Sequence, residues 1–167
     1  MSEPITEHLR VLRPADGILA FYDGRIEGQR FADEPNWVDR GALSLGVCSY
    51  ALVAGDEALV YDTHVTLDHA HAIRAALAAE GVRKVTVVLS HWHLDHIAGT
   101  EVFADCEIIA NRRTMAHLTR HQAAIEAGTK SGPPAIDPLI LPTRLFDGPL
   151  TLTLGGRSVE LIECDIH

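Results

Sequence analysis

The sequence lacks the features that mark a membrane-spanning or secreted protein. No apolar run is long enough to span a bilayer. The N-terminal residues 1–4 have neither the cationic nor the apolar region of a signal peptide. The cysteines Cys48, Cys106 and Cys164 are scattered, odd in number and form no CxxC pair. We therefore expect a cytoplasmic protein with reduced thiols and no membrane contact.

Positive charge is also scarce. The chain has 14 Lys and Arg against 23 Asp and Glu, a formal net charge of −9, which argues against general nucleic-acid binding. A small-molecule substrate stays open, because a bound metal ion can dominate the local field. With 47% apolar and 22% charged residues, 167 residues suffice for one soluble domain with a real core.

Residues 85–89 are an apolar run. The short segment directly after this run contains several side chains that commonly bind metal ions. This segment carries His91, His93, Asp95 and His96. Imidazole and carboxylate groups both bind zinc and suit other divalent first-row metals. The preceding run is typical of a fully buried strand, and open α/β sheets place their sites at the carboxyl ends of such strands. The segment therefore predicts a metal site holding one or two zinc ions, with iron or manganese as alternatives.

Spacing suggests how one segment serves two metals. On extended backbone, His91 and His93 would point the same way. Asp95 and His96 lie beyond the strand end, where a turn can aim them at a neighbouring point. We expect Trp92 to pack rather than react. The alternative interpretation is a histidine-rich loop whose rings are hydrogen-bonded individually.

The pattern His-x-His-x-Asp-His resembles the metallo-β-lactamase superfamily. The resemblance implies an α/β fold (α+β in some classifications) with four layers, helix–sheet–sheet–helix. It covers most of the chain, which we expect to be a single domain over residues 1–167, corresponding to about the N-terminal half and incomplete at the C-terminus. The segments that carry the likeness before the motif are Val47–Val53, Ala58–Tyr61, Asp62-Thr63, Leu67–Glu80 and Val85–Leu89.

In the resembled family, an aspartate at the place of Asp62 supports the metal site by contacting the metal ligands without binding the metal itself. A carboxylate can do this by orienting a ligand histidine through its distal N–H. The alternative is an aspartate that caps a helix or forms a turn. The family usually has glycine where His64 stands, which leaves His64 either near the metals or exposed.

A helix is expected after this turn. Thr66 is a good N-cap and Gly81 a good stop, with Leu67, Ala70, Ile73 and Leu77 on one face. His69 and His71 are predicted on the solvent side, too divergent to share a metal. With the flanking strands, the helix forms a parallel strand–helix–strand unit.

The rest of the chain predicts a strand at 107–110, a helix from Asn111 to about Ala127 and a long loop at 129–149. Residues 150–154 and 157–162 flank Gly155-Gly156 as a β-hairpin. The helix carries a polar side that we interpret as solvated, with contact to an anionic substrate as the alternative. This side is made of Arg112, Arg113, His117, Arg120 and His121.

The resemblance also gives the terminal His167 a role as the third ligand of the first metal, beside His91 and His93. The alternative is a terminal histidine with no such role. Asp95 and His96 would begin the second metal site. The family needs a further Asp and a later His, and the sequence stops before both positions, so we expect the chain alone to be a poor catalyst.

Functionally, the resemblance implies a metal-dependent hydrolase that uses a metal-bound hydroxide. Asp95 would orient the nucleophile or take its proton. The substrate classes left open are a small ester, lactone, thioester, β-lactam, phosphate ester or sulfate ester. An iron-dependent oxidoreductase on the same fold and a non-catalytic fragment or binding module are the alternatives. A homodimer is also left open.

Overall fold

The computed structural model of the chain describes residues 4–164. Seven strands form one sheet, in the spatial order of the chain: β1 (Arg10–Ala15), β2 (Ile18–Asp23), β3 (Val47–Ala54), β4 (Glu57–Tyr61), β5 (Lys84–Leu89), β6 (Glu107–Asn111) and β7 (Arg144–Phe146). A separate hairpin pairs β8 (Leu150–Leu154) with β9 (Arg157–Leu161). The helical segments are η1 (Val38–Leu43), α1 (Leu67–Ala79), α2 (Leu94–Ile97), η2 (Thr100–Phe103) and α3 (Arg112–Glu126).

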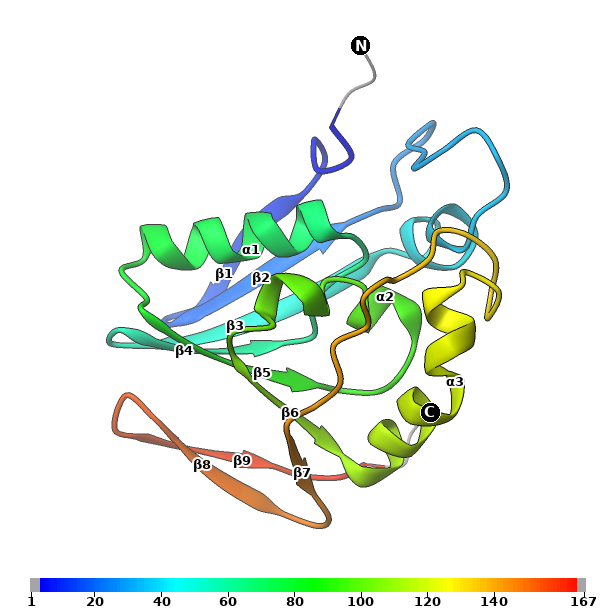
Figure 1. Ribbon diagram of the computed structural model, residues 1–167. Helices are drawn as coiled ribbons and strands as arrows, with labels where there is room; N and C mark the ends of the chain where they lie inside the picture. The colour runs from blue at the N-terminus through cyan, green and yellow to red at the C-terminus, as the bar shows by residue number, and fades with distance from the viewer. Residues whose placement is uncertain (1–3, 165–167) are drawn as a thin grey trace.

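The sheet changes character halfway across. Strands β1 to β4 pair antiparallel, whereas β4 to β7 pair parallel. The carboxyl ends of β4, β5 and β6 therefore meet at one edge of the sheet. The segments leaving these ends are residues 62–66, residues 90–93 and α3, so the topology brings the motif and Asp62 to one place (Figure 1).

Two apolar clusters follow from the period-two alternation of the strands. Val60 and Val87 face the helices and join the main core with Ile73 and Leu77 of α1. The intervening residues Leu59, Val88 and Ile109 face the other way and pack under Leu154 of the hairpin. Figure 1 shows the resulting layers, with α1 on one face of the sheet and β8–β9 across the other.

The hairpin covers only part of its face. Tyr50 and Tyr61 are directly paired across β3 and β4, on the same face as Leu52 and Leu59. Leu52 and Leu59 lie under the hairpin cluster, but Tyr50 and Tyr61 remain 41% and 39% exposed. Within residues 4–164, no helix is both long and apolar enough to cross a membrane.

The expected strand–helix–strand unit is present as β4, α1 and β5, and Thr66 caps α1 by accepting the backbone N–H of His69. The short strand β7 was not predicted within the loop that precedes the hairpin. Two predictions for α1 are wrong. Leu67 is exposed at the first helical position, and His69 is fully buried rather than solvated.

His69 is buried because a carboxylate far away in sequence meets it. Its Nε2 lies 2.8 Å from Oδ2 of the buried Asp23, at the end of β2, and its Nδ1 lies 2.7 Å from Oγ1 of Thr66. Oδ1 of Asp23 accepts hydrogen bonds from the Gly24 N–H and the Gln29 side chain. Burial alone would raise the pKa of Asp23, but the bonds from His69, Gln29 and Gly24 lower it. The network joins β2 to the start of α1.

His64 is buried beside this network. Its ring stacks on that of His69, with centroids 4.4 Å apart and planes 5° from parallel. Neither ring nitrogen of His64 makes a hydrogen bond of normal geometry within the described residues. Burial, followed by the neighbouring His69, lowers the pKa of His64 to about 3. His64 is therefore neutral in the folded protein, and the expectation that leaves it exposed is wrong.

The buried His64 ring predicts a loss of stability in mild acid. In the unfolded chain this histidine takes up a proton below its ordinary pKa of about 6.5, while in the folded protein it does so only near pH 3. The unfolded state thus binds more protons, and stability falls as the pH drops through this window, by up to about 1.4 kcal/mol per pH unit. We expect His64→Asn, which tolerates the left-handed backbone there, to flatten this dependence.

Urea unfolding of both proteins between pH 7 and pH 4 measures the effect. His71→Asn is the matched control, because His71 is an exposed histidine on α1, the helix that follows His64 in the chain. An unchanged slope in His64→Asn would contradict the assignment.

Candidate metal centre

The candidate centre lies where two adjacent parallel strands end. Asp62 directly follows β4 and Ser90 directly follows β5. Residues 91–93 continue from Ser90 as a short loop, and α2 then carries Asp95 and His96. The fold therefore gathers the predicted motif and the predicted supporting aspartate at one edge of the sheet.

Asp62 connects these segments through three hydrogen bonds. Its Oδ1 accepts the backbone N–H of Ser90 at 2.7 Å, and its Oδ2 accepts the Ser90 hydroxyl at 2.7 Å and Nδ1 of His96 at 2.8 Å. The Ser90 hydroxyl oxygen also lies 2.8 Å from Nδ1 of His91. Both rings are thus held through Nδ1, so Nε2 is the nitrogen that each would offer to a metal ion.

The backbone around Asp62 is shaped for this contact. Asp62 and His64 both adopt the left-handed conformation, with φ of 67° at each. This conformation is costly for residues other than glycine and concentrates at functional sites. Between them, the Thr63 N–H and hydroxyl both donate to the His96 carbonyl, at 2.8 and 3.1 Å. Gly99 permits the backbone after α2 to pack closely against Thr63, because a Cβ at Gly99 would lie 2.2 Å from the Thr63 carbonyl oxygen.

The histidine rings of the motif are in mutual contact. The ring centroid of His91 lies 4.5 Å from that of His93 and 4.2 Å from that of His96. Nε2 of His96 lies 3.3 Å from Oδ2 of Asp95. Within residues 4–164, no three His, Cys, Asp or Glu side chains are arranged as a ready metal-ligand set. The donor types nevertheless fit a divalent cation of the first transition row.

The local charges agree with that fit. Burial opposes the charged form of His96, but hydrogen bonds and attraction to Asp62 and Asp95 outweigh it and raise its pKa to about 10. Burial likewise opposes the ionised form of Asp95, but His96 and then His93 act against it and lower the Asp95 pKa. Two carboxylates thus favour a positive charge at this point. A proton supplies that charge here, and a metal ion would supply it when bound.

The structure brings together Asp62, His91, His93, Asp95 and His96. Their role as ligands or support stays a prediction, and His167 lies outside the described residues. Ser90 and Thr63 were not predicted as part of the site. The signal for Ser90 was its position between a buried strand and the first motif histidine.

Comparison with known proteins gives the context for this geometry. The model of a protein family described as the metallo-beta-lactamase superfamily matches residues 44–165. None of the curated proteins matches the sequence.

Solved structures share the fold. The DIM-1 metallo-beta-lactamase, solved after exposure to ceftazidime, is 17% identical with a TM-score of 0.61, over 87% of this chain and 55% of its own. A metallo-beta-lactamase from Pontibacter korlensis is 13% identical with a TM-score of 0.63, over 91% of this chain and 59% of its own. TMB-1 is 16% identical with a TM-score of 0.54, over 92% of this chain and 65% of its own. The chain thus spans 55% to 65% of the length of these structures, and they confirm the α/β class expected from the sequence.

If Asp62 orients the ligand histidines, its removal must weaken metal binding. We expect Asp62→Ala to lower zinc affinity by about 10- to 100-fold, the usual cost of losing a group that holds a metal ligand. Competition with a chromophoric chelator measures the affinity, and circular dichroism confirms that the variant is folded.

Asp56→Ala is the control for that experiment. Asp56 is an exposed turn aspartate whose side chain pairs with Arg83, away from the motif. Equal zinc affinities in folded Asp62→Ala and Asp56→Ala would show that Asp62 has no supporting role.

Proposed function

The chain belongs to the metallo-beta-lactamase superfamily, and from this premise we propose that the protein acts as a metal-dependent hydrolase on a small ester, lactone, thioester or related substrate. The observation that carries the proposal is the Asp62 network. One buried carboxylate holds Ser90 and His96 directly, and His91 through Ser90, so that the imidazoles of the motif lie together.

The proposed ligands are His91, His93 and His167 for one metal ion, with Asp95 and His96 beginning a second site. Zinc suits these donors, and iron and manganese also accept them. A metal ion held there lowers the pKa of water and polarises the scissile bond.

Asp95 has the position and charge of a proton acceptor in this scheme. Its side chain is 27% exposed, so a substrate or a water molecule can reach it. Its lowered pKa keeps it ionised at neutral pH. We assign Oδ2 of Asp95 to orient the attacking water molecule and to take its proton.

His96 and Asp62 play a positioning part. His96 is fixed through Nδ1 by Asp62, and its backbone carbonyl is fixed by Thr63. Neither ring nor backbone therefore needs to reorganise when substrate arrives, which is how preorganised sites avoid an entropic cost.

The proposal predicts a split between turnover and binding when Asp95 is changed. In a protein that carries the whole domain, Asp95→Asn should lower kcat by about 10²- to 10⁴-fold, the usual contribution of a positioned acid or base. The KM should change far less, because the residue acts on the reacting water molecule. Steady-state hydrolysis of an ester, lactone and thioester panel measures both.

Two controls test whether that loss of turnover is specific to Asp95 and whether the activity depends on a metal ion. Asp33→Asn changes an exposed aspartate in the loop before η1 and should leave kcat intact. A chelator should abolish the activity, and zinc or manganese should restore it. Hydrolysis that survives the chelator, or full turnover by Asp95→Asn, would refute the mechanism.

A further inference from the structure

Trp92, between the first two histidines of the motif, is stacked against α3. Its ring lies 4.9 Å from that of His117, with planes 5° apart, and 6.0 Å from that of His121. His117 is exposed and His121 is partly exposed, as the prediction of a solvated helix side requires, and both rings also contact Trp92. The edge of His93 also meets Trp92, with ring centroids 4.8 Å apart. The stack thus adjoins the candidate metal centre directly.

A lysine completes this group. Nζ of Lys130 lies 5.1 Å from the centroid of the Trp92 ring, within the range of a cation–π contact. The backbone of Lys130 is held in place, because the Lys130 and Thr129 N–H groups both donate to the Ala124 carbonyl near the end of α3. We call Trp92, His117, His121 and Lys130 the Trp92 rim.

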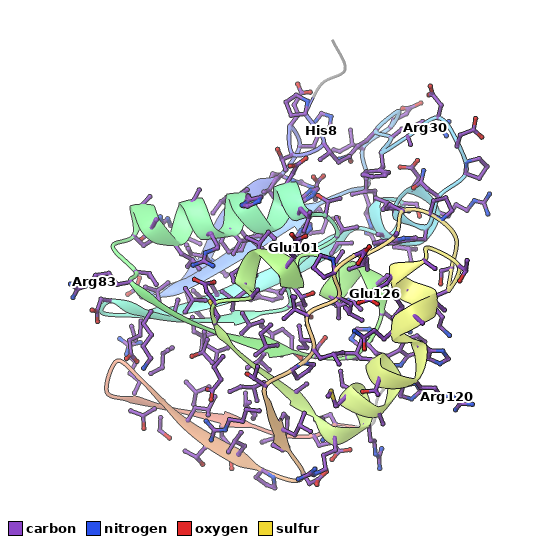
Figure 2. The ribbon with its side chains drawn as sticks, in the orientation of Figure 1. His8, Arg30, Arg83, Glu101, Arg120 and Glu126 are labelled. Carbon is purple, nitrogen blue, oxygen red and sulfur yellow. The ribbon has the colours of Figure 1, made fainter. Side chains whose placement is uncertain are left out.

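Lys130 gives the rim a formal positive charge in an acidic chain. Glu126 is the single acidic residue of α3, and its Oε1 accepts bonds from the Gln122 side chain and the Leu139 N–H. Figure 2 shows Glu126 on the inner side of α3, whereas Arg120 extends from the helix into solvent. Partial burial, then the charges of Lys130 and Arg120, lower the pKa of His121. No carboxylate of α3 is thus left to neutralise Lys130.

We propose that the Trp92 rim binds the anionic group, a carboxylate or a phosphate, of the substrate on which the adjacent metal centre acts. The Lys130 ammonium and the imidazole N–H groups are donors to an anion, and charge-assisted hydrogen bonds of this kind are the strong ones. The contact of Trp92 with His93 places such a group beside a candidate ligand. The inference rests on the proposed function only in calling the bound anion part of a substrate.

The chain offers a built-in probe of this surface. It contains two tryptophans, Trp37 and Trp92, and therefore two indole N–H signals in a ¹H–¹⁵N spectrum. Trp37 donates its indole N–H to the Pro134 carbonyl, is not one of the rim residues, and serves as an internal reference. Trp92→Phe assigns the two signals. Benzoate and phenyl phosphate, titrated into metal-free protein, represent the two anions, and benzamide is the neutral analogue of benzoate.

We expect benzoate, phenyl phosphate or both to shift the Trp92 signal saturably, while the Trp37 signal and the benzamide titration stay flat. Lys130→Met should weaken anion binding by about tenfold, as expected for one charge-assisted hydrogen bond. Lys84→Met is the matched control, because Lys84 is the other lysine of the chain and pairs with Glu57.

Three results would overturn the proposal: no shift of Trp92 with either anion, an equal response to benzamide, or equal weakening by Lys84→Met and Lys130→Met. Because the titrations contain no metal, such a failure leaves the proposed hydrolysis intact. Conversely, anion binding at the rim of a protein that takes up no zinc would count against the hydrolase alone.

Discussion

The buried carboxylate of Asp62 is the group on which the candidate centre depends. It accepts two hydrogen bonds from Ser90 and one from His96, and so joins the ends of β4 and β5 to α2. A buried carboxylate without donors would be costly, and here three donors satisfy it. The left-handed backbone of Asp62 is the local strain that this arrangement sustains. These bonds fix the His96 ring and, through Ser90, the His91 ring, so the groups that satisfy the carboxylate also orient two candidate ligands.

A second buried carboxylate supports the same region from the other side of the turn. Asp23 holds His69, His69 stacks on His64, and His64 follows the Asp62-Thr63 pair in the chain. The turn between β4 and α1 is thus confined by the motif on one side and by this network on the other. Gly99 adds a steric condition, because only a residue without Cβ allows α2 and η2 to approach Thr63 so closely. The centre is therefore built by the packing of several segments, and the motif alone would not produce it.

Much of this arrangement could be predicted from the sequence, for identifiable reasons. The strand before His91, the Thr66 cap and the Gly155-Gly156 hairpin are local patterns, and each appears where it was expected, although only the second half of that strand is fully buried. The burial of His69 could not be predicted, because its partner Asp23 lies 46 residues away and forms no motif with it. The stacking of His117 on Trp92 also depends on how α3 meets the motif loop, which no local pattern specifies. The role of Ser90 depends in the same way on the pairing of β4 with β5.

The most direct test of this account is which ring nitrogen of each histidine binds zinc. Asp62 and Ser90 hold His96 and His91 through Nδ1, so zinc should bind both through Nε2 while Nδ1 keeps its proton. Two-bond ¹H–¹⁵N correlation spectra of the imidazole rings, recorded during a zinc titration, distinguish the two nitrogens. The account predicts a shift of the Nε2 resonance in both residues. Coordination through Nδ1 in either, or spectra unchanged by stoichiometric zinc, would contradict it.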